Sequence, residues 1–460
     1  MIRSLSNIAN WKFWLSFHIL LGLLTYVTKW ALVGWLYLFI LLSLWEILRN
    51  RKSFIVLVGF SLAYITGIEL LCRIAKTSPY IPYEFGKYYF VLIVGIFILV
   101  KGELKMNIGI IIMILCLPAL FFIPEEGYRT YLVNSFSGIF LTGMLAYIFS
   151  SRKIYIHELK SLFVLMLYGI IVITISIIVG SPDIDQIEFD LVANSQTTAN
   201  FGSNQVSTLL GLGILITGIS LLLKLRLFNP RLITLSFFIL FAIRGLLTFS
   251  RGGILGGAIS LMVFYFMPNV SKLKPQKINI FLFLFIVTVL VGSFFYVNSL
   301  TNNVLVDRYK GETPGTKLGY REVTLETITS RRSSLIFAEW GIFLENPIFG
   351  VGPGAGYAAR EEKIGMRIAS HTEVTRLLAE HGLFGLVIAL IFLLYPVYKV
   401  SKTEYGFDRL LSAAFFSFAV FTSMHAAMRT TVTPFLWGLG CATFIGQAPL
   451  FKMKKTQNRQ

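Results

Sequence analysis

Residues 161–180, SLFVLMLYGIIVITISIIVG, are twenty consecutive residues without a charged side chain. An α-helix rises about 1.5 Å per residue, so this segment can cross the roughly 30 Å hydrocarbon core of a bilayer. Similar apolar runs recur along the whole chain. Runs of this length and composition predict transmembrane helices. The expected fold is therefore an all-α polytopic membrane protein.

The composition excludes an ordinary soluble protein. The chain has 460 residues, of which 55% are hydrophobic and only 14% charged, with a mean hydropathy of +0.73. Soluble domains carry roughly 25% charged residues. The three cysteines, Cys72, Cys116 and Cys441, lie in or beside apolar runs, which excludes a disulfide framework and a cysteine-based zinc site. No small-residue cleavage pattern follows Arg3 and Lys12, so we expect no removable signal peptide.

Fourteen apolar segments predict fourteen transmembrane helices. An even number of helices places both ends of the chain on the same side of the membrane. The predicted segments are 13–30, 31–48, 54–72, 88–100, 108–123, 131–149, 161–180, 205–223, 232–249, 253–267, 278–298, 383–398, 410–427 and 431–449.

Basic residues predict the orientation of these segments. A connection rich in Lys and Arg follows every second segment, and such connections mark the cytoplasmic face. Both termini are therefore expected in the cytoplasm. Together with the N-terminus and Glu46, which lies just before the first of them, these connections hold 23 of the 41 basic and five of the 23 acidic residues, which accounts for the net charge of +18. The charge thus gives no reason to expect a nucleic acid partner. The basic connections are 49–52, 101–105, 152–160, 224–231, 272–277, 399–409 and 452–459.

Two long segments lie on the opposite, outer face. Residues 181–204 are acidic and then polar, whereas residues 299–382 form one connection of 84 residues with ten basic and ten acidic residues. A connection of that length is uncommon and usually functional. We therefore divide the chain into a membrane bundle at 1–298, a large helical outer loop with the candidate motifs at 299–382, three further membrane segments at 383–451 and a basic cytoplasmic tail at 452–460.

Ionisable residues are rare inside the predicted membrane segments. Glu69 lies in the third segment, and Arg244 and Arg251 lie in and at the end of the ninth. Such residues are costly in a bilayer and are functional candidates. Seven positions separate the two arginines, which would place them on one face of a continuous helix. Arg251 belongs to Ser-Arg-Gly-Gly, residues 250–253, where glycines permit a tight reversal. The alternative is an arginine that extends from a helix end to the membrane surface.

Two stretches of the outer loop resemble phosphate-binding elements. Ser-Arg-Arg-Ser-Ser, residues 330–334, opens an apolar-periodic helix, and arginine beside a helix N-terminus favours phosphate. An exposed basic turn is the alternative. Asn-Pro-Ile-Phe-Gly-Val-Gly-Pro-Gly-Ala-Gly, residues 346–356, has the glycines of a phosphate cradle but follows a helix on the outer face. A tight structural turn that closes over a ligand is therefore favoured over a nucleotide loop.

A third stretch of the loop places a histidine at the start of a helix. His371 precedes an apolar stripe with Leu377, Leu378 and His381, and Gly382 is expected to end that helix. A histidine can take a proton from a hydroxyl group near neutral pH. His371 is therefore a candidate general base.

Metal binding is not expected. The sequence has no His-Glu-x-x-His, and His381 and His425 are not at ligand spacing. Asp-Ile-Asp, residues 183–185, could hold a metal on a nucleotide diphosphate, but the outer face offers no such nucleotide. A solvated acidic loop is the favoured interpretation.

Three elements now stand in order along the chain. They are Ser-Arg-Gly at 250–252, Arg332 followed by Asn-Pro-x-x-Gly-x-Gly at 346–352, and His371 before a helix that runs into Gly-Leu-x-Gly at 382–385. In this order and spacing they resemble the O-antigen ligase and O-antigen polymerase superfamily. The resemblance covers roughly residues 235–400, and outside that stretch it rests on the number of membrane segments.

The resemblance implies a membrane glycosyltransferase with a GT-C-like helical fold in the bacterial inner membrane. Its donor is a glycan on undecaprenyl pyrophosphate, its active site faces the periplasm, and it needs neither a cofactor nor a metal. Expected partners are the lipid-linked oligosaccharide, a lipid A–core or growing glycan acceptor, and membrane lipids.

The resemblance also assigns roles to residues. Arg251 and Arg332 match the two arginines that hold the donor pyrophosphate, and His371 matches the histidine that activates the acceptor hydroxyl. Thr372 stands where the family often has Asn, so that contact is not carried over. A base opposite the leaving phosphate predicts inversion at the anomeric carbon. Two arginines are secondary candidates for donor binding: Arg244 and Arg331.

Two other functions remain open at this stage. A polymerase that joins repeat units would use the same donor and residues as a ligase, and the general form of the loop slightly favours the ligase. A transporter of lipid-linked sugars would carry ionisable groups near the bilayer midplane. Here the specialised residues gather at the outer surface instead.

Overall fold

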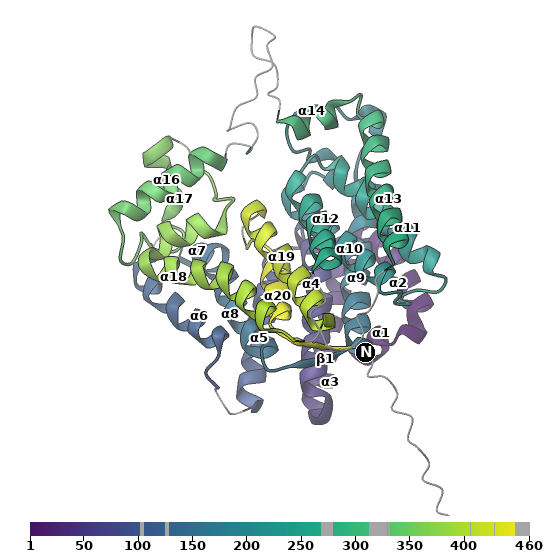
Figure 1. Cartoon of the computed structure of the whole chain (residues 1–460), viewed down its shortest axis with the longest axis horizontal. Helices are drawn as coiled ribbons and strands as arrows, with labels where there is room; N and C mark the ends of the chain where they lie inside the picture. The colour runs from purple at the N-terminus through teal and green to yellow at the C-terminus, as the bar shows by residue number, and fades with distance from the viewer. Residues whose placement is uncertain are drawn as a thin grey trace, which may run out of the picture.

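The computed structural model describes residues 1–101, 105–124, 128–267, 279–311, 329, 332–365, 367–404, 406–426 and 428–446. Most of these residues form α-helices (Figure 1). The elements are α1 (Ile2–Ser6), α2 (Trp11–Val27), α3 (Lys29–Arg49), α4 (Phe54–Ile74), α5 (Phe85–Lys101), α6 (Ile108–Cys116), α7 (Tyr128–Tyr131), α8 (Ser137–Phe149), β1 (Lys153–Tyr155), α9 (Ile156–Gly180), α10 (Ser203–Leu222), α11 (Arg231–Leu247), α12 (Arg251–Phe266), α13 (Ile280–Leu300), α14 (Val304–Lys310), α16 (Arg332–Glu345), α17 (Gly356–Ile364), α18 (Glu373–Lys402), α19 (Gly406–Ala426), α20 (Val432–Gly440) and β2 (Thr443–Ile445).

The predicted membrane segments all contain a helix, but these helices differ in length. The protein is an integral membrane protein, as predicted. Three of the predicted segments, α2, α5 and α11, have 17 residues each, which corresponds to about 25 Å of helix. The number of fourteen spans stays a prediction. Within the described ranges, eight helices are long and apolar enough to cross a membrane: Lys29–Arg49, Arg51–Ile74, Leu132–Phe149, Ile156–Gly180, Ser203–Leu222, Ile280–Leu300, Glu373–Lys402 and Gly406–Ala426.

The structure corrects the all-α prediction at the last predicted segment. In the described part of this segment, residues 431–446, the nine-residue helix α20 is followed by the strand β2. β2 pairs in parallel with β1, with Lys153 opposite Thr443 and Tyr155 opposite Ile445. Every residue of α20 is buried. A short buried helix and a buried strand are as apolar as a membrane span, so the hydrophobic pattern alone could not separate them.

Segments predicted on the inner face lie together at one end of the molecule. The Met1 amino group lies 2.8 Å from a carboxylate oxygen of Glu46, and the Phe444 amide donates to the Asp408 carboxylate at 3.1 Å. α1 and β1 are at this end, whereas α14, α16 and α17 are at the opposite end (Figure 1). This arrangement agrees with the predicted alternation of the connections. Which of the two ends faces the cytoplasm stays a prediction.

Two groups of helices meet at the end of the molecule that carries α14, α16 and α17 (Figure 1). α12 packs against α10, and α16 packs against α17 and α18. α19 contacts both α12 and α18, so it links the two groups. α18 has a break at Gly382 (φ 59°, ψ −135°), where the sequence predicted the end of a helix. The part of α18 before this break places the start of the helix near the C-terminal end of α19.

Candidate active site

Arg251 is the first residue of α12 and does not belong to the preceding helix. α11 ends at Leu247, and the chain reverses through residues 248–250, where Phe249 has a φ of 54°. This corrects the expectation that Arg244 and Arg251 share one helix face, because they lie on different helices. The reversal is only three residues long, Thr248, Phe249 and Ser250, and contains no Gly or Pro, so the sequence showed no clear helix end before Arg251.

Arg244 secures the C-terminal end of α9. Its Nη2 donates to the Ile177 carbonyl at 3.3 Å, to Ser181 Oγ at 3.3 Å and to the Thr197 carbonyl at 3.0 Å. Carbonyl groups in the last turn of a helix have no partner within that helix. The contacts therefore give Arg244 a structural task, and its secondary role in donor binding stays a prediction.

The Ser-Arg-Gly motif surrounds one histidine of α19. Ser250 Oγ lies 3.0 Å from Nε2 of His425 and 2.7 Å from Oδ1 of Asn204. A Cβ atom on Gly252 would lie 2.1 Å from Cγ of the same imidazole ring. Any other residue at this position would displace the ring, so the glycine of the motif makes room for His425.

The outer-loop arginine Arg332 reaches the same histidine. Its Nη2 lies 2.9 Å from Nδ1 of His425 and 3.3 Å from the His425 carbonyl oxygen. Burial, followed by the charge of Arg251, lowers the pKa of Arg332 to about 10. The two arginines therefore lie close enough to repel each other, and Arg332 remains charged at neutral pH. Arg331, the secondary candidate beside it, lies outside the described residues.

A third arginine, Arg308 of α14, lies beside these two. Nη1 of Arg251 donates to the Arg308 carbonyl at 3.2 Å, while the Arg308 side chain donates to the carbonyls of Leu191 and Phe249 at 2.6 and 3.3 Å. Burial, followed by the charges of Arg251 and Arg332, lowers the pKa of Arg308 to about 10. Asp190 lies near enough to raise the pKa of Arg308 in turn. A region with three guanidinium groups favours a polyanion.

His371 lies at the start of α18, just before the N-cap residue Thr372. It is half-buried, and its Nδ1 has no hydrogen-bond partner in the part of the chain that the structure describes. Burial, followed by the charges of Arg429, Arg332 and Arg360, lowers the pKa of His371 to about 4. The imidazole is therefore neutral at pH 7 and carries a lone pair that can accept a proton.

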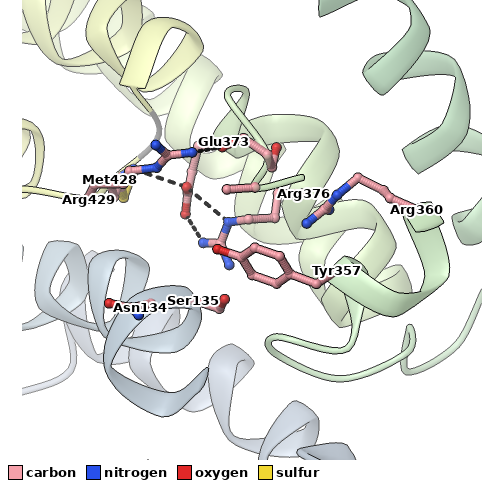
Figure 2. A pocket seen from close by; sticks show the side chains of 10 residues that line it. Asn134, Ser135, Tyr357, Arg360, Glu373, Arg376, Met428 and Arg429 are labelled. Atoms are coloured by element: carbon pink, nitrogen blue, oxygen red, sulfur yellow. Dashed lines mark hydrogen bonds and ion pairs between the residues drawn. The ribbon is translucent and has the colours of Figure 1, made fainter. Parts of the chain in front are cut away.

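The connection between α19 and α20 holds the chain around His371. Nη2 of Arg429 donates to the Ser370 carbonyl at 2.8 Å, and the Met428 amide donates to the Glu373 carboxylate at 3.2 Å. Figure 2 shows these residues around a small cavity of about 20 Å³, which is enough for one water molecule. His371 lies between the two anchored residues, so this connection helps to fix its position.

Buried ion pairs fix the helices next to His371. Nη1 of Arg376 lies 2.6 Å from a carboxylate oxygen of Glu380, and its Nη2 contacts Glu373. Nη1 of Arg360 lies 2.8 Å from Glu339, and both of these side chains are completely buried. Each of these carboxylates is thus the ion-pair partner of an arginine. Across the described ranges, no group of three or more His, Cys, Asp and Glu residues could hold a metal ion.

The glycine-rich stretch forms a structural turn, as its favoured interpretation predicted. The amides of Val351 and Gly352 donate to the carbonyls of Ala379 and Glu380 at 3.0 and 3.1 Å. Gly350 has a φ of +70°, and a Cβ atom there would lie 2.5 Å from the Glu380 carbonyl carbon. The turn therefore caps the first part of α18. Closure over a ligand stays a prediction.

A comparison with protein families gives a match for this region. A family model described as O-antigen ligase matches residues 235–390, which include Arg251, Arg332 and His371. Residues 235–390 are therefore similar to the O-antigen ligase family. The predicted resemblance to the O-antigen ligase and polymerase superfamily is confirmed over this stretch, and family members are membrane glycosyltransferase-like enzymes. A search of curated proteins found no match to the chain.

Three residues of the site were missed in the sequence. His425 lies in an apolar predicted span, and its position there was a usable signal because ionisable residues in spans are costly. Arg308 lies in the long outer connection and Arg429 in a short one, and in such connections a basic residue is usually exposed. Their burial depends on contacts with distant segments, and no local pattern shows those contacts.

Proposed function

We propose that the protein is an O-antigen ligase-like glycosyltransferase. It moves a glycan from undecaprenyl pyrophosphate to a hydroxyl group of a lipid A–core acceptor at the outer face of the bacterial inner membrane. The observation that carries this proposal is the convergence of Ser250–Gly252 and Arg332 on His425. The charge of Arg332 also lowers the pKa of His371. These motifs are far apart in the sequence, and a donor pyrophosphate would contact the two arginines, Arg251 and Arg332.

The arginines bind the donor and stabilise the departing group. Arg251 and Arg332 lie close enough to lower the pKa of Arg332, so a pyrophosphate between them relieves their repulsion. Negative charge grows on the phosphate oxygen as the bond to the sugar breaks. Positioned guanidinium groups stabilise that charge more in the transition state than in the ground state. Arg308 adds a third positive charge at the same place.

His371 activates the acceptor. Its neutral imidazole accepts the proton of the acceptor hydroxyl while the hydroxyl oxygen bonds to the anomeric carbon. The bond from that carbon to the phosphate oxygen breaks, and undecaprenyl pyrophosphate leaves with the electron pair. The charges that lower the pKa of His371 include Arg332, so binding of the anionic donor raises this pKa and makes the imidazole a stronger base. Attack opposite the leaving group inverts the anomeric configuration.

The direct test uses purified protein in vesicles with a lipid-linked glycan donor and a lipid A–core acceptor. We expect transfer by the parental protein and strongly reduced transfer by Arg251→Ala, Arg332→Ala and His371→Ala. Arg367→Ala is the matched control, because the side chain of Arg367 is 61% exposed in a surface pair with Glu361. Transfer at the parental rate by all three site variants would overturn the proposal.

A gene deletion separates the ligase from the polymerase. If the protein is a ligase, the deletion strain carries no glycan on its lipid core. A single repeat unit left on the core would identify a polymerase with the same donor chemistry.

A further inference from the structure

We infer that His425 is a positioning residue for Arg332, and that Ser250 fixes the tautomer of His425 that this task requires. The inference rests on the proposed function, since it concerns how the donor arginine is held. His425 lies in α19, outside the residues that match the O-antigen ligase family model.

The hydrogen-bond donors around the imidazole determine its tautomer. A guanidinium group has N–H donors and no acceptor. Nδ1 of His425 lies 2.9 Å from Nη2 of Arg332, so Nδ1 must carry the lone pair. The proton of the neutral ring is then on Nε2, which donates to Ser250 Oγ at 3.0 Å. The hydroxyl of Ser250 in turn donates to Asn204 Oδ1 at 2.7 Å, so each group in the chain has a consistent role.

A histidine suits this position because it is a neutral acceptor. A carboxylate would hold Arg332 more strongly but would cancel the charge that the donor pyrophosphate needs. The imidazole orients the guanidinium group and leaves its charge in place. Because His425 accepts from Nη2 alone, the contact does not consume the N–H groups on Nε and Nη1, which a phosphate can take.

His425 also links the two groups of helices that form the site. Arg332 begins α16 in the outer loop, whereas His425 lies near the end of α19 in the membrane bundle. The side chain of His425 is 2% exposed and packs against Gly252, so the ring itself has little freedom. Arg332 is therefore held relative to Arg251 through a rigid part of the bundle.

Two substitutions at His425 separate the two ring nitrogens. Asn places an amide oxygen near the position of Nδ1 and can still accept a hydrogen bond from Arg332. Gln places its amide near the position of Nε2 and can form a hydrogen bond only with Ser250. We expect His425→Gln to raise the KM for the donor about tenfold, and His425→Asn to keep it within about twofold. Thermal unfolding of both variants is measured in parallel. Equal KM changes in the two variants would overturn the inference.

A double-mutant cycle distinguishes this inference from the proposed function. If His425 acts through Arg332, then His425→Gln changes the donor KM in the parental protein and leaves it unchanged in the Arg332→Ala background. An additive increase in the Arg332→Ala background would overturn the positioning role alone. A parental donor KM in Arg332→Ala itself would instead overturn the proposed donor site.

Discussion

Two sets of arginines near His371, one buried and one half-buried, have different electrostatic surroundings. In the α16–α18 group, Arg360 faces Glu339 at 2.8 Å and Arg376 contacts two carboxylates of its own helix. At the junction with the bundle, Arg332 instead contacts a neutral imidazole, and its pKa is lowered by burial and by another arginine. Arg360 and Arg376 are each matched by a carboxylate, whereas Arg332 lies near a second arginine, Arg251.

This difference separates structural arginines from arginines that can bind an anion. A buried ion pair is costly to form and more costly to break, because the remaining partner is then buried without compensation. Arg332, which contacts an imidazole, keeps its positive charge, which a pyrophosphate can use. We therefore expect substitutions in the first set to reduce stability and substitutions in the second set to reduce donor use.

The largest effect is expected for His371, which lies between the two sets. His371→Ala removes the proposed base and should lower kcat for glycan transfer by about 10²–10⁴-fold. The donor KM should change little, because the alanine variant retains Arg251 and Arg332. Transfer is measured in vesicles at saturating donor. A parental kcat would exclude His371 as the base.

Arg332 should show the next largest effect. Arg332→Ala should lower kcat/KM for the donor by about 10²–10³-fold, since it removes a donor to the developing charge. Arg332→Lys keeps the charge but loses the planar fork, so it should recover only part of the activity. The melting temperature should fall much less than in substitutions of the ion-paired set. If lysine restored full activity, charge alone rather than bidentate geometry would be needed here.

The ion-paired set is tested by Glu339→Leu. This variant leaves Arg360 buried without its carboxylate and should lower the free energy of unfolding by about 3–5 kcal/mol. Adding Arg360→Met removes the isolated charge and should restore most of the loss. Thermal and denaturant unfolding in detergent measure both variants. If Glu339→Leu alone were as stable as the parental protein but had lost donor binding, the proposed division between the two sets would be wrong.

The membrane pattern and the three motifs could be predicted from the sequence, because apolar length and spaced Gly, Arg and His residues are local signals. The reversal between Arg244 and Arg251 could not, since it takes only three residues and none of them is Gly or Pro. The β1–β2 pair joins segments that are far apart in the chain. His425 of α19, which contacts Arg332, and Arg429 of the following connection, which contacts Ser370, are likewise distant in the sequence from these partners. A single sequence gives no register for such contacts.

A smaller effect is expected for the pH profile. The proposed base must be neutral, so kcat/KM should fall as the pH decreases through the pKa of free His371, near 4. Arg429 is the largest charged contributor to the lowered pKa, and Arg429→Gln removes that charge while its amide can still donate to the Ser370 carbonyl. The acid limb should therefore move to higher pH in this variant. A limb that stayed in place or moved to lower pH would contradict the assignment.

Donor binding without turnover tests the central claim most directly. The affinity of purified protein in lipid nanodiscs is measured for undecaprenyl pyrophosphate and for undecaprenyl monophosphate. The parental protein and Arg367→Ala should prefer the pyrophosphate, whereas Arg251→Ala and Arg332→Ala should lose most of that preference. Equal preference in all four proteins would contradict the assignment of these two arginines to the donor pyrophosphate.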